Sequence, residues 1–333
     1  MSATALVLAA GEGTRMKSSL PKVAHRILGL PMVEYAIRAA REAGCDRVVV
    51  VTGHQAEEVE ALVSGVTFAR QDRRLGTGHA VMCAADALRG VTGSLLVLAG
   101  DCPLLAPETL AELIQSREES NAACSLLSTR LADPAGYGRI IRDAGGAIVG
   151  IVEDKDLADD QRAIDEVNTS TYCFDIETLF AHLQRLGTSN AQGEYYLTDM
   201  IDIFRRAGLA VVGVEAADPN EMLGVNSRVQ LAEAAGILQR RINVRHMLAG
   251  VTMTDPGLVW VGPDVVIGRD TVLEPMTFLL GDTSVGERCV IGPNARVSDS
   301  RIGNGCVVSD AVLADQALAD GASAIPCQCE GEH

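Results

Sequence analysis

The sequence predicts an α/β domain followed by a short left-handed parallel β-helix. Apolar, β-rich runs alternate with stretches of helical spacing through about residue 225, which indicates a largely parallel sheet covered by helices. After one long predicted helix, apolar residues recur every six positions, which is the signature of a parallel β-helix. At 333 residues the chain is long enough for both parts.

The elements of the first domain follow from short apolar runs separated by helical spacing. We predict strands at 6–8, 47–52, 94–99, 123–128, 147–152 and 210–214. Helices are predicted at 32–43, 78–87 and 107–115, and a longer one at 227–248 begins at a capping Ser227 and ends before Gly250. The expected boundaries are an α/β domain at 1–226, a linker helix at 227–249, a β-helix at 250–316 and a tail at 317–333.

The six-residue repeat predicts the β-helix. It runs without a slip through Val261, Ile267, Leu273, Leu279, Val285, Ile291 and Val297, and its phase resumes at Ile302 and Val308. Each of these side chains would point into a triangular core built from three hexads per coil. About three coils fit into this length, and the register then dissolves in 317–324.

Charge and composition exclude several classes of function. The net charge of −16 argues against nonspecific binding to nucleic acid or to an anionic membrane. No apolar stretch reaches the ~18 residues of a membrane-spanning helix, and no signal peptide is visible, so we expect no membrane insertion. The nine cysteines lie mostly in apolar runs, which is typical of reduced thiols in a cytoplasmic protein.

The stretch LVLAAGEGTRM at 6–16 is the first candidate for a binding site. It places a glycine loop at the carboxyl end of a buried strand, where open α/β sheets bind ligands, and Arg15 adds a cation. The dinucleotide fingerprint and the P-loop both fail at Met16, where each requires glycine. These residues alone leave two interpretations open, a phosphate-binding loop and an ordinary strand-to-helix turn.

Eight further motifs accompany this stretch in order along the chain. They are LPK at 20–22, Q-x-x-x-x-GTGHA at 71–80, GDCPL at 100–104, GYGRI at 136–140, IVEDKD at 151–156, EVNT at 166–169, NAQGEYYLTD at 190–199 and GVNSR at 224–228. With them the chain resembles the bacterial N-acetylglucosamine-1-phosphate uridylyltransferases that are normally fused to a glucosamine-1-phosphate acetyltransferase. The resemblance covers essentially the whole chain and implies a Rossmann-like nucleotidyltransferase domain at 1–226.

The resemblance also implies a reaction and the residues that carry it. The implied reaction is Mg²⁺-dependent transfer of UMP from UTP to N-acetylglucosamine-1-phosphate, giving UDP-N-acetylglucosamine, a precursor in peptidoglycan, lipopolysaccharide and cell wall biogenesis, and pyrophosphate. Arg15 and Lys22 match the cations that stabilise the leaving pyrophosphate, since this reaction needs charge neutralisation rather than a protein nucleophile. Asp101 is the third expected catalytic residue and would bind Mg²⁺ together with Asn226.

The family's substrate contacts carry over to matching positions. Uracil recognition is implied at Ala9, Ala10, Gln71, Gly76 and Thr77, and recognition of the acetylglucosamine at Gly138, Glu153 and Asn168. The full expected substrate-binding set is Leu8, Ala9, Ala10, Gly11, Gly13, Lys22, Gln71, Gly76, Thr77, Gly100, Asp101, Gly138, Glu153, Asn168 and Asn226. Taken singly, Gln71 or Glu153 would read as an ordinary surface residue, and Asp101 or Asn226 as a turn or capping residue.

Two features depart from the family pattern. Ser170 stands where glycine is expected, and Cys102 occupies a variable position beside Asp101. The family's acetyltransferase half runs through many more coils, so we expect acetyltransferase activity to be absent from this chain. Its short β-helix is expected to support assembly, with a homotrimer as the family's arrangement.

Two alternatives to this reaction stay open at this point. One is another sugar-1-phosphate nucleotidyltransferase, for glucose or galactosamine derivatives. The other is a non-catalytic sugar-nucleotide-binding assembly protein.

Overall fold

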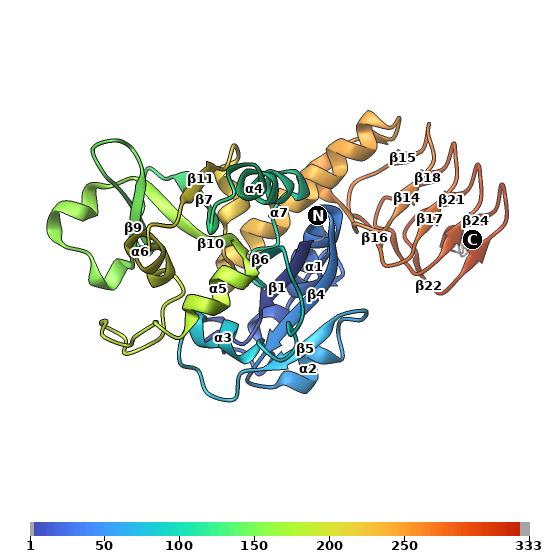
Figure 1. The fold of residues 1–333 in the computed structure, drawn as a ribbon. Coiled ribbons are helices and arrows are strands. Elements are labelled where there is room, and N and C mark those ends of the chain that lie inside the picture. Colours follow the sequence, from blue (N-terminus) through green and yellow to red (C-terminus); the bar gives the residue numbers. More distant parts are fainter. Residues whose placement is uncertain (1–2, 327–333) are drawn as a thin grey trace, which may run out of the picture. The chain divides into compact units, whose positions relative to one another are not determined.

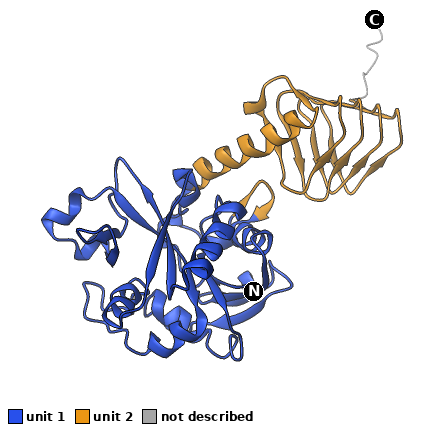
Figure 2. Ribbon diagram, turned by 45° about the horizontal axis from the view of Figure 1, so that its top comes forward, with its two compact units in different colours: residues 1–25, 31–230 blue, residues 26–30, 231–333 orange. Residues whose placement is uncertain are grey.

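The computed structural model describes residues 3–326 and divides into two compact units (Figure 1, Figure 2). Unit 1 comprises residues 1–25 and 31–230, and unit 2 comprises residues 26–30 and 231–333. The boundary expected after residue 226 therefore differs slightly, because the first turn of the long helix, up to Gln230, belongs to unit 1.

Unit 1 is built on one twisted, mostly parallel sheet. Its main path has the order β11-β7-β10-β6-β1-β4-β5, and a hairpin of β8 and β9 extends from β10. The strands are β1 Ala3–Leu8, β4 Cys45–Thr52, β5 Thr67–Arg70, β6 Ser94–Ala99, β7 Cys124–Arg130, β8 Arg139–Arg142, β9 Ile148–Val152, β10 Glu166–Asp175 and β11 Val211–Glu215. Only β10 runs antiparallel to both of its neighbours on this path.

Helices cover both faces of this sheet (Figure 1). One face is covered by α1 Met32–Glu42, α2 Ala56–Glu60 and α4 Pro107–Ser120. The other face is covered by α3 Thr77–Cys83, α5 Ile176–Leu183 and α6 Asp199–Arg206. In α1, Val33, Ile37 and Ala40 are buried at helical spacing, which explains why this segment forms a helix on the sheet.

Unit 2 is the predicted left-handed parallel β-helix. Three parallel sheets, β12-β15-β18-β21-β24, β13-β16-β19-β22 and β14-β17-β20-β23, form its three faces. Their strands are β12 Thr252–Met253, β13 Val259–Val261, β14 Val266–Ile267, β15 Val272–Leu273, β16 Thr277–Leu280, β17 Ser284–Val285, β18 Val290–Ile291, β19 Arg296–Ser298, β20 Arg301–Ile302, β21 Val307–Val308, β22 Val312–Ala314, β23 Ala317–Leu318 and β24 Ser323–Ala324. The hexad residues from Val261 to Val308 are all buried.

The β-helix continues beyond the end that the sequence predicted. The six-residue repeat predicts an end at residue 316, but β23 pairs with β20, and β24 pairs with β21, in the same parallel register. The six-residue spacing does not predict this part because the inward-facing residues are closer together here. Leu313 follows Val308 after five residues, and Leu318 follows Leu313 after five. The rest of the predicted tail, from residue 327, lies outside the described residues.

Helix α7 Arg228–Leu248 carries two buried amides that bind the first coil. Gln239 Nε2 donates to the carbonyl of Val259 at 2.7 Å, and Asn243 Nδ2 donates to the same oxygen at 2.8 Å. A short hairpin of β2 Arg26–Ile27 and β3 Leu30–Pro31 adds Leu28 to the same core. Ile242 of the helix and Leu28 of the hairpin also pack against the apolar core of the β-helix.

The described residues also bear on membrane-spanning helices and on the state of the cysteines. No helix within residues 3–326 is long and apolar enough to cross a membrane. The seven cysteines in the same range are all free thiols.

Candidate active site

The site begins where β1 and β6 end side by side. These strands pair in parallel register through Leu8 and Ala99, so the residues that follow each of them meet at one edge of the sheet. Gly100 N–H donates to the carbonyl of Leu8 at 2.9 Å, and a side chain at Gly100 would come within 3.2 Å of that oxygen. This close approach favours glycine before Asp101, because any side chain there would be in a tight contact.

The glycine loop after β1 forms no regular helix. Its residues make a single 3₁₀ turn at Thr14–Met16, preceded by Gly13 in the left-handed region with φ of 66°. A second 3₁₀ turn, Lys22–Ala24, starts after Pro21. The loop thereby folds back so that Gly13 packs on Lys22, whose Cβ would lie 2.5 Å from a Cβ at position 13.

Lys22, Asp101 and Asn226 come together from three separate segments of the chain. The Lys22 ammonium donates to the Asp101 carboxylate and, at 3.0 Å, to Asn226 Oδ1. The Val225 N–H donates to the carbonyl of Asp101 at 2.9 Å, which holds the Asn226 segment in place. The Lys22 and Asp101 side chains are only 13% and 16% exposed, so their charges interact in a partly dehydrated environment.

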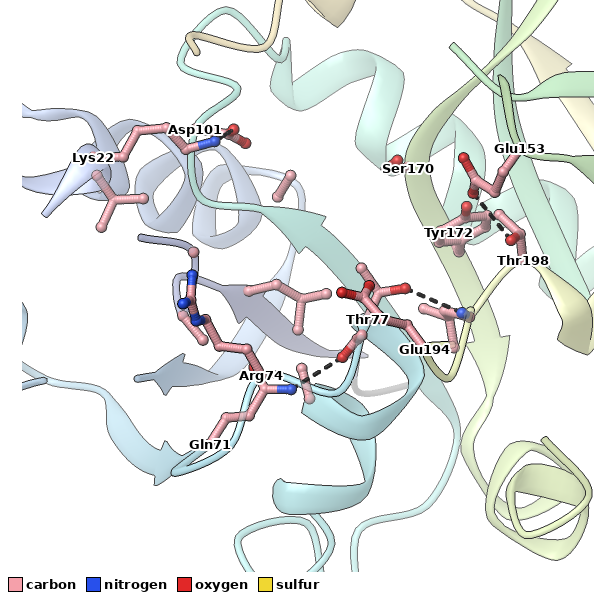
Figure 3. A pocket seen from close by; sticks show the side chains of 18 residues that line it. Lys22, Gln71, Arg74, Thr77, Asp101, Glu153, Ser170, Tyr172, Glu194 and Thr198 are labelled. Carbon is pink, nitrogen blue, oxygen red and sulfur yellow. Dashed lines mark hydrogen bonds and ion pairs between the residues drawn. The ribbon is translucent and has the colours of Figure 1, made fainter. Parts of the chain in front are cut away.

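A cavity of about 370 Å³ opens beside this cluster (Figure 3). Its lining includes nine of the expected site residues, Leu8, Ala10, Gly11, Lys22, Gln71, Gly76, Thr77, Asp101 and Glu153. Figure 3 shows Lys22 and Asp101 on one side of the cavity and Glu153, Tyr172 and Thr198 on another.

The segment at 71–77 forms another wall of the cavity. Gly76 has φ of 102°, and a Cβ there would lie 2.5 Å from the carbonyl of Tyr195, so only glycine fits. The Leu197 N–H donates to Thr77 Oγ1 at 3.1 Å, which fastens this wall to the 194–198 segment. Gln71 is buried, and its Nε2 donates to the carbonyl of Gly76 at 3.0 Å.

Glu153, Tyr172 and Thr198 line the side of the first cavity that lies away from Lys22 and Asp101. Thr198 Oγ1 donates to Glu153 Oε1 at 3.1 Å. Burial raises the pKa of Glu153, an effect that the Thr198 hydrogen bond opposes and the nearby Asp199 carboxylate reinforces. The Asn168 amide donates to the Tyr172 hydroxyl at 2.7 Å. The side chains of Glu153 and Tyr172 are therefore each held in place by a hydrogen bond, from Thr198 and from Asn168.

A second cavity, of about 290 Å³, adjoins the first. It is lined by Arg15, Asn168 and Asn226, and it shares Asp101, Ser170 and Ala99 with the first cavity. Arg15 is exposed and makes no ion pair or hydrogen bond within residues 3–326, which leaves its charge available to a ligand. Asp101 thus faces both cavities.

Four of the expected residues line neither cavity. Ala9 is buried and its N–H donates to the carbonyl of Val51, while Gly13 and Gly100 have the packing contacts described above. The carbonyl of Gly138 accepts a hydrogen bond from the Asn168 N–H at 2.8 Å. These residues shape the loops around the cavities.

Sequence reasoning did not assign several lining residues, namely Arg74, Tyr172, Glu194, Leu197 and Thr198. Glu194, Leu197 and Thr198 lie in the motif NAQGEYYLTD, and this placement was the only available signal. Ser170, noted as a departure from the family's glycine, lines both cavities and has φ of 59°, in the region that favours glycine.

The oxygens around Lys22 are suited to a cation. A carboxylate of Asp101 and an amide oxygen of Asn226 already converge on one positive charge, the Lys22 ammonium. Carboxylate and amide oxygens are also what Mg²⁺ prefers, with water and substrate phosphates completing its shell. Within residues 3–326 there is no group of three or more His, Cys, Asp or Glu side chains placed to hold a metal ion.

Comparisons with known proteins support both units. Residues 5–162 match the MobA-like NTP transferase domain, and residues 264–299 match the bacterial transferase hexapeptide family with six repeats. The fold also resembles the crystal structure of UDP-glucose pyrophosphorylase complexed with UDP-glucose, with a TM-score of 0.58 and 19% identity over 72% of this chain and 100% of that chain.

Curated relatives match nearly the whole chain. The bifunctional protein GlmU of Trichlorobacter lovleyi is 47% identical over 92% of this chain and 66% of its own length. The GlmU proteins of Halalkalibacterium halodurans and Thermoanaerobacter pseudethanolicus are 47% and 48% identical, over 93% and 92% of this chain and 68% and 67% of their own lengths. The chain therefore spans about two thirds of the length of these relatives.

Fold and site together define a nucleotidyltransferase with a hexapeptide-repeat β-helix. The chain belongs to the family of bifunctional GlmU proteins. The family resemblance and the fold class predicted from the sequence are thus confirmed. Family and domain together support UTP-dependent uridylyl transfer to N-acetylglucosamine-1-phosphate, and GlmU-like nucleotidyltransferases generally depend on a divalent metal.

Proposed function

We propose that this chain transfers UMP from UTP to N-acetylglucosamine-1-phosphate in the two adjoining cavities. The observation that carries the proposal is the convergence of Lys22, Asp101 and Asn226 from three distant segments at the point where the cavities meet. A phosphate oxygen of the sugar phosphate would attack the α-phosphorus of UTP, and the bond to the β-phosphate oxygen would break to release pyrophosphate. The attacking phosphate is already ionised, so no general base is required.

The cations and oxygens of the site have separate roles in this proposal. Lys22 and Arg15 would neutralise the charge that develops on the leaving pyrophosphate. Asp101 and Asn226 would hold Mg²⁺, which supplies charge neutralisation and alignment of the phosphates when bound. Since Lys22 already contacts both oxygens, it would have to turn from them toward the phosphates.

The two remaining walls would bind the base and the sugar. The segment containing Gln71, Gly76 and Thr77 would bind uracil, and the buried position of Gln71 supports a fixed geometry there. Gln71 Nε2 already donates to Gly76, so the carbonyl oxygen of the Gln71 amide would be the group that accepts a hydrogen bond from uracil. Glu153 and Asn168 would bind the sugar, with hydroxyl groups donating to the Glu153 carboxylate.

Location and assembly also belong to the proposal. The free thiols of the described cysteines support a reducing, cytoplasmic environment. The hexapeptide repeats of the β-helix support side-by-side assembly into a homotrimer. Mg²⁺, UTP and N-acetylglucosamine-1-phosphate are the proposed ligands.

A panel of substrates tests the proposal. Pyrophosphate release would be measured with UTP, ATP, CTP or GTP, each combined with the 1-phosphates of N-acetylglucosamine, glucose and N-acetylgalactosamine. We expect UTP with N-acetylglucosamine-1-phosphate to react fastest. A faster reaction with another pair would identify a different sugar-1-phosphate nucleotidyltransferase, and no release with any pair would support a non-catalytic sugar-nucleotide-binding protein.

A further inference from the structure

Glu12 places a negative charge inside the glycine loop that would receive the triphosphate. It lies between Gly11, which lines the first cavity, and Gly13, which packs on Lys22. The proposed function places the β- and γ-phosphates at Lys22. An isolated carboxylate at this position would repel a polyanion.

Arg74 pairs with this carboxylate. Its Nη1 lies 2.5 Å from Glu12 Oε2, although the two residues belong to different loops of the site. Arg74 itself lines the cavity, and in Figure 3 its side chain extends from the loop before α3 toward the side where Lys22 lies. The pair therefore joins the loop of the proposed base wall to the loop of the proposed phosphate wall.

Stability of the fold does not explain this pair. The Arg74 and Glu12 side chains are 57% and 36% exposed, and such exposed ion pairs contribute little to the stability of the fold. The effect on a polyanion in the adjacent cavity is larger, because one unbalanced carboxylate acts on several phosphate charges at once.

We propose that Arg74 is a positioning residue that neutralises Glu12 and so sets the affinity of the site for a nucleoside triphosphate. The inference rests on the proposed function insofar as that function places the triphosphate beside Lys22. The affinity then depends on the net charge of the pair, so the two residues must be changed together to leave binding unaltered.

A double-mutant cycle tests this coupling. The dissociation constant of UTP would be measured by calorimetry for the wild type, Arg74→Gln, Glu12→Gln and the double variant. We expect Arg74→Gln to weaken binding and Glu12→Gln to tighten it by similar factors, each about fivefold, since the first leaves a net negative and the second a net positive charge. The double variant should return to within roughly twofold of the wild type, because the net charge is again zero.

Direct contact between Arg74 and the phosphates would give a different pattern. The double variant would then bind UTP as weakly as Arg74→Gln does, and the neutralising role would be wrong. An unchanged affinity in Arg74→Gln would overturn the proposal equally. The matched control is Arg73→Gln, which removes the same charge from the neighbouring exposed residue that does not line the cavity. It should shift the affinity by less than roughly twofold.

Inorganic triphosphate serves as a second probe that separates this inference from the proposed function. Its binding depends on the charge of the loop and does not require recognition of uracil. If the protein rejected UTP but bound inorganic triphosphate in the order predicted for the four variants, the proposed function would be contradicted and the role of the pair supported. If the four variants bound inorganic triphosphate equally, the role of the pair would be wrong, whatever the result with UTP.

Discussion

The ammonium of Lys22 donates to the carboxylate of Asp101, the residue proposed to hold the catalytic metal. Lys22 thus occupies the position in which a cation is best stabilised by Asp101 and Asn226. A divalent cation and the ammonium would compete for the same oxygens, and their mutual repulsion adds to this competition.

This competition predicts that Lys22→Met binds Mn²⁺ more tightly than the wild type does when no nucleotide is present. We expect a several-fold gain, about threefold to tenfold, because methionine removes the charge while filling a similar space. Mn²⁺ binding would be followed by electron paramagnetic resonance. The control is Lys155→Met, since Lys155 is exposed and bonds only to Gln192 among the described residues. Weaker or equal Mn²⁺ binding by Lys22→Met would show that the ammonium does not compete with the metal.

Asp101→Asn should lower turnover by about 10²–10³-fold at saturating Mg²⁺, which is typical for the loss of one preorganised electrostatic group. Asparagine keeps the size of the side chain and an oxygen that can accept from Lys22, so the melting temperature should change little. Turnover is measured by pyrophosphate release. Asp86→Asn is the matched control because Asp86 forms an exposed pair with Arg89. Near-wild-type turnover of Asp101→Asn would remove Asp101 from the proposed mechanism.

The sequence predicted most of unit 1 where strands are continuously apolar. β6, for example, occupies the predicted residues, and Leu95, Leu96 and Leu98 in it are fully buried. The antiparallel strand β10 was missed because it carries polar residues that look like those of a surface segment. Its Glu166 is buried only because Arg142 and Ser128 bind its carboxylate, and such tertiary pairing leaves no local signal.

In the candidate site, too, the sequence predicts features with a local signal and misses those that depend on tertiary contacts. Residues inside family motifs could be named from the sequence, but the contacts that organise them connect distant segments. Lys22 and Asn226 are 204 positions apart, and Thr77 and Leu197 are 120 apart. The contribution of Arg74 becomes visible only when its pairing with Glu12 is known.

Ser170 should be replaceable by glycine but not by valine. Its backbone lies at φ of 59°, where a β-branched residue is strained and glycine is not. We expect Ser170→Val to be about 1–2 kcal/mol less stable than Ser170→Gly, as measured by urea unfolding. The KM for N-acetylglucosamine-1-phosphate should rise in Ser170→Val and stay near the wild-type value in Ser170→Gly, since Ser170 lines both cavities. Equal stability of the two variants would contradict the strained backbone.

Glu153→Gln should stabilise the folded protein at neutral pH. Burial raises the pKa of Glu153, so the folded state favours the protonated form, and stability is lost as the pH rises from the unfolded pKa through the folded pKa. The melting temperature of Glu153→Gln should therefore exceed that of the wild type at pH 7, and the difference should shrink toward a constant value by about pH 3, where Glu153 is protonated in both states. A melting-temperature difference that did not depend on pH would rule out this explanation. The same variant should bind the sugar phosphate more weakly, because an acceptor charge is lost.

The identity of the product tests the central claim most directly. The protein would be incubated with UTP, N-acetylglucosamine-1-phosphate and Mg²⁺, and the products would be analysed by mass spectrometry, with Asp101→Asn prepared in parallel to expose a contaminating enzyme. The account predicts UDP-N-acetylglucosamine and pyrophosphate in equal amounts from the wild type, and strongly reduced amounts from Asp101→Asn. Absence of UDP-N-acetylglucosamine from the wild type, or equal formation by both proteins, would contradict it.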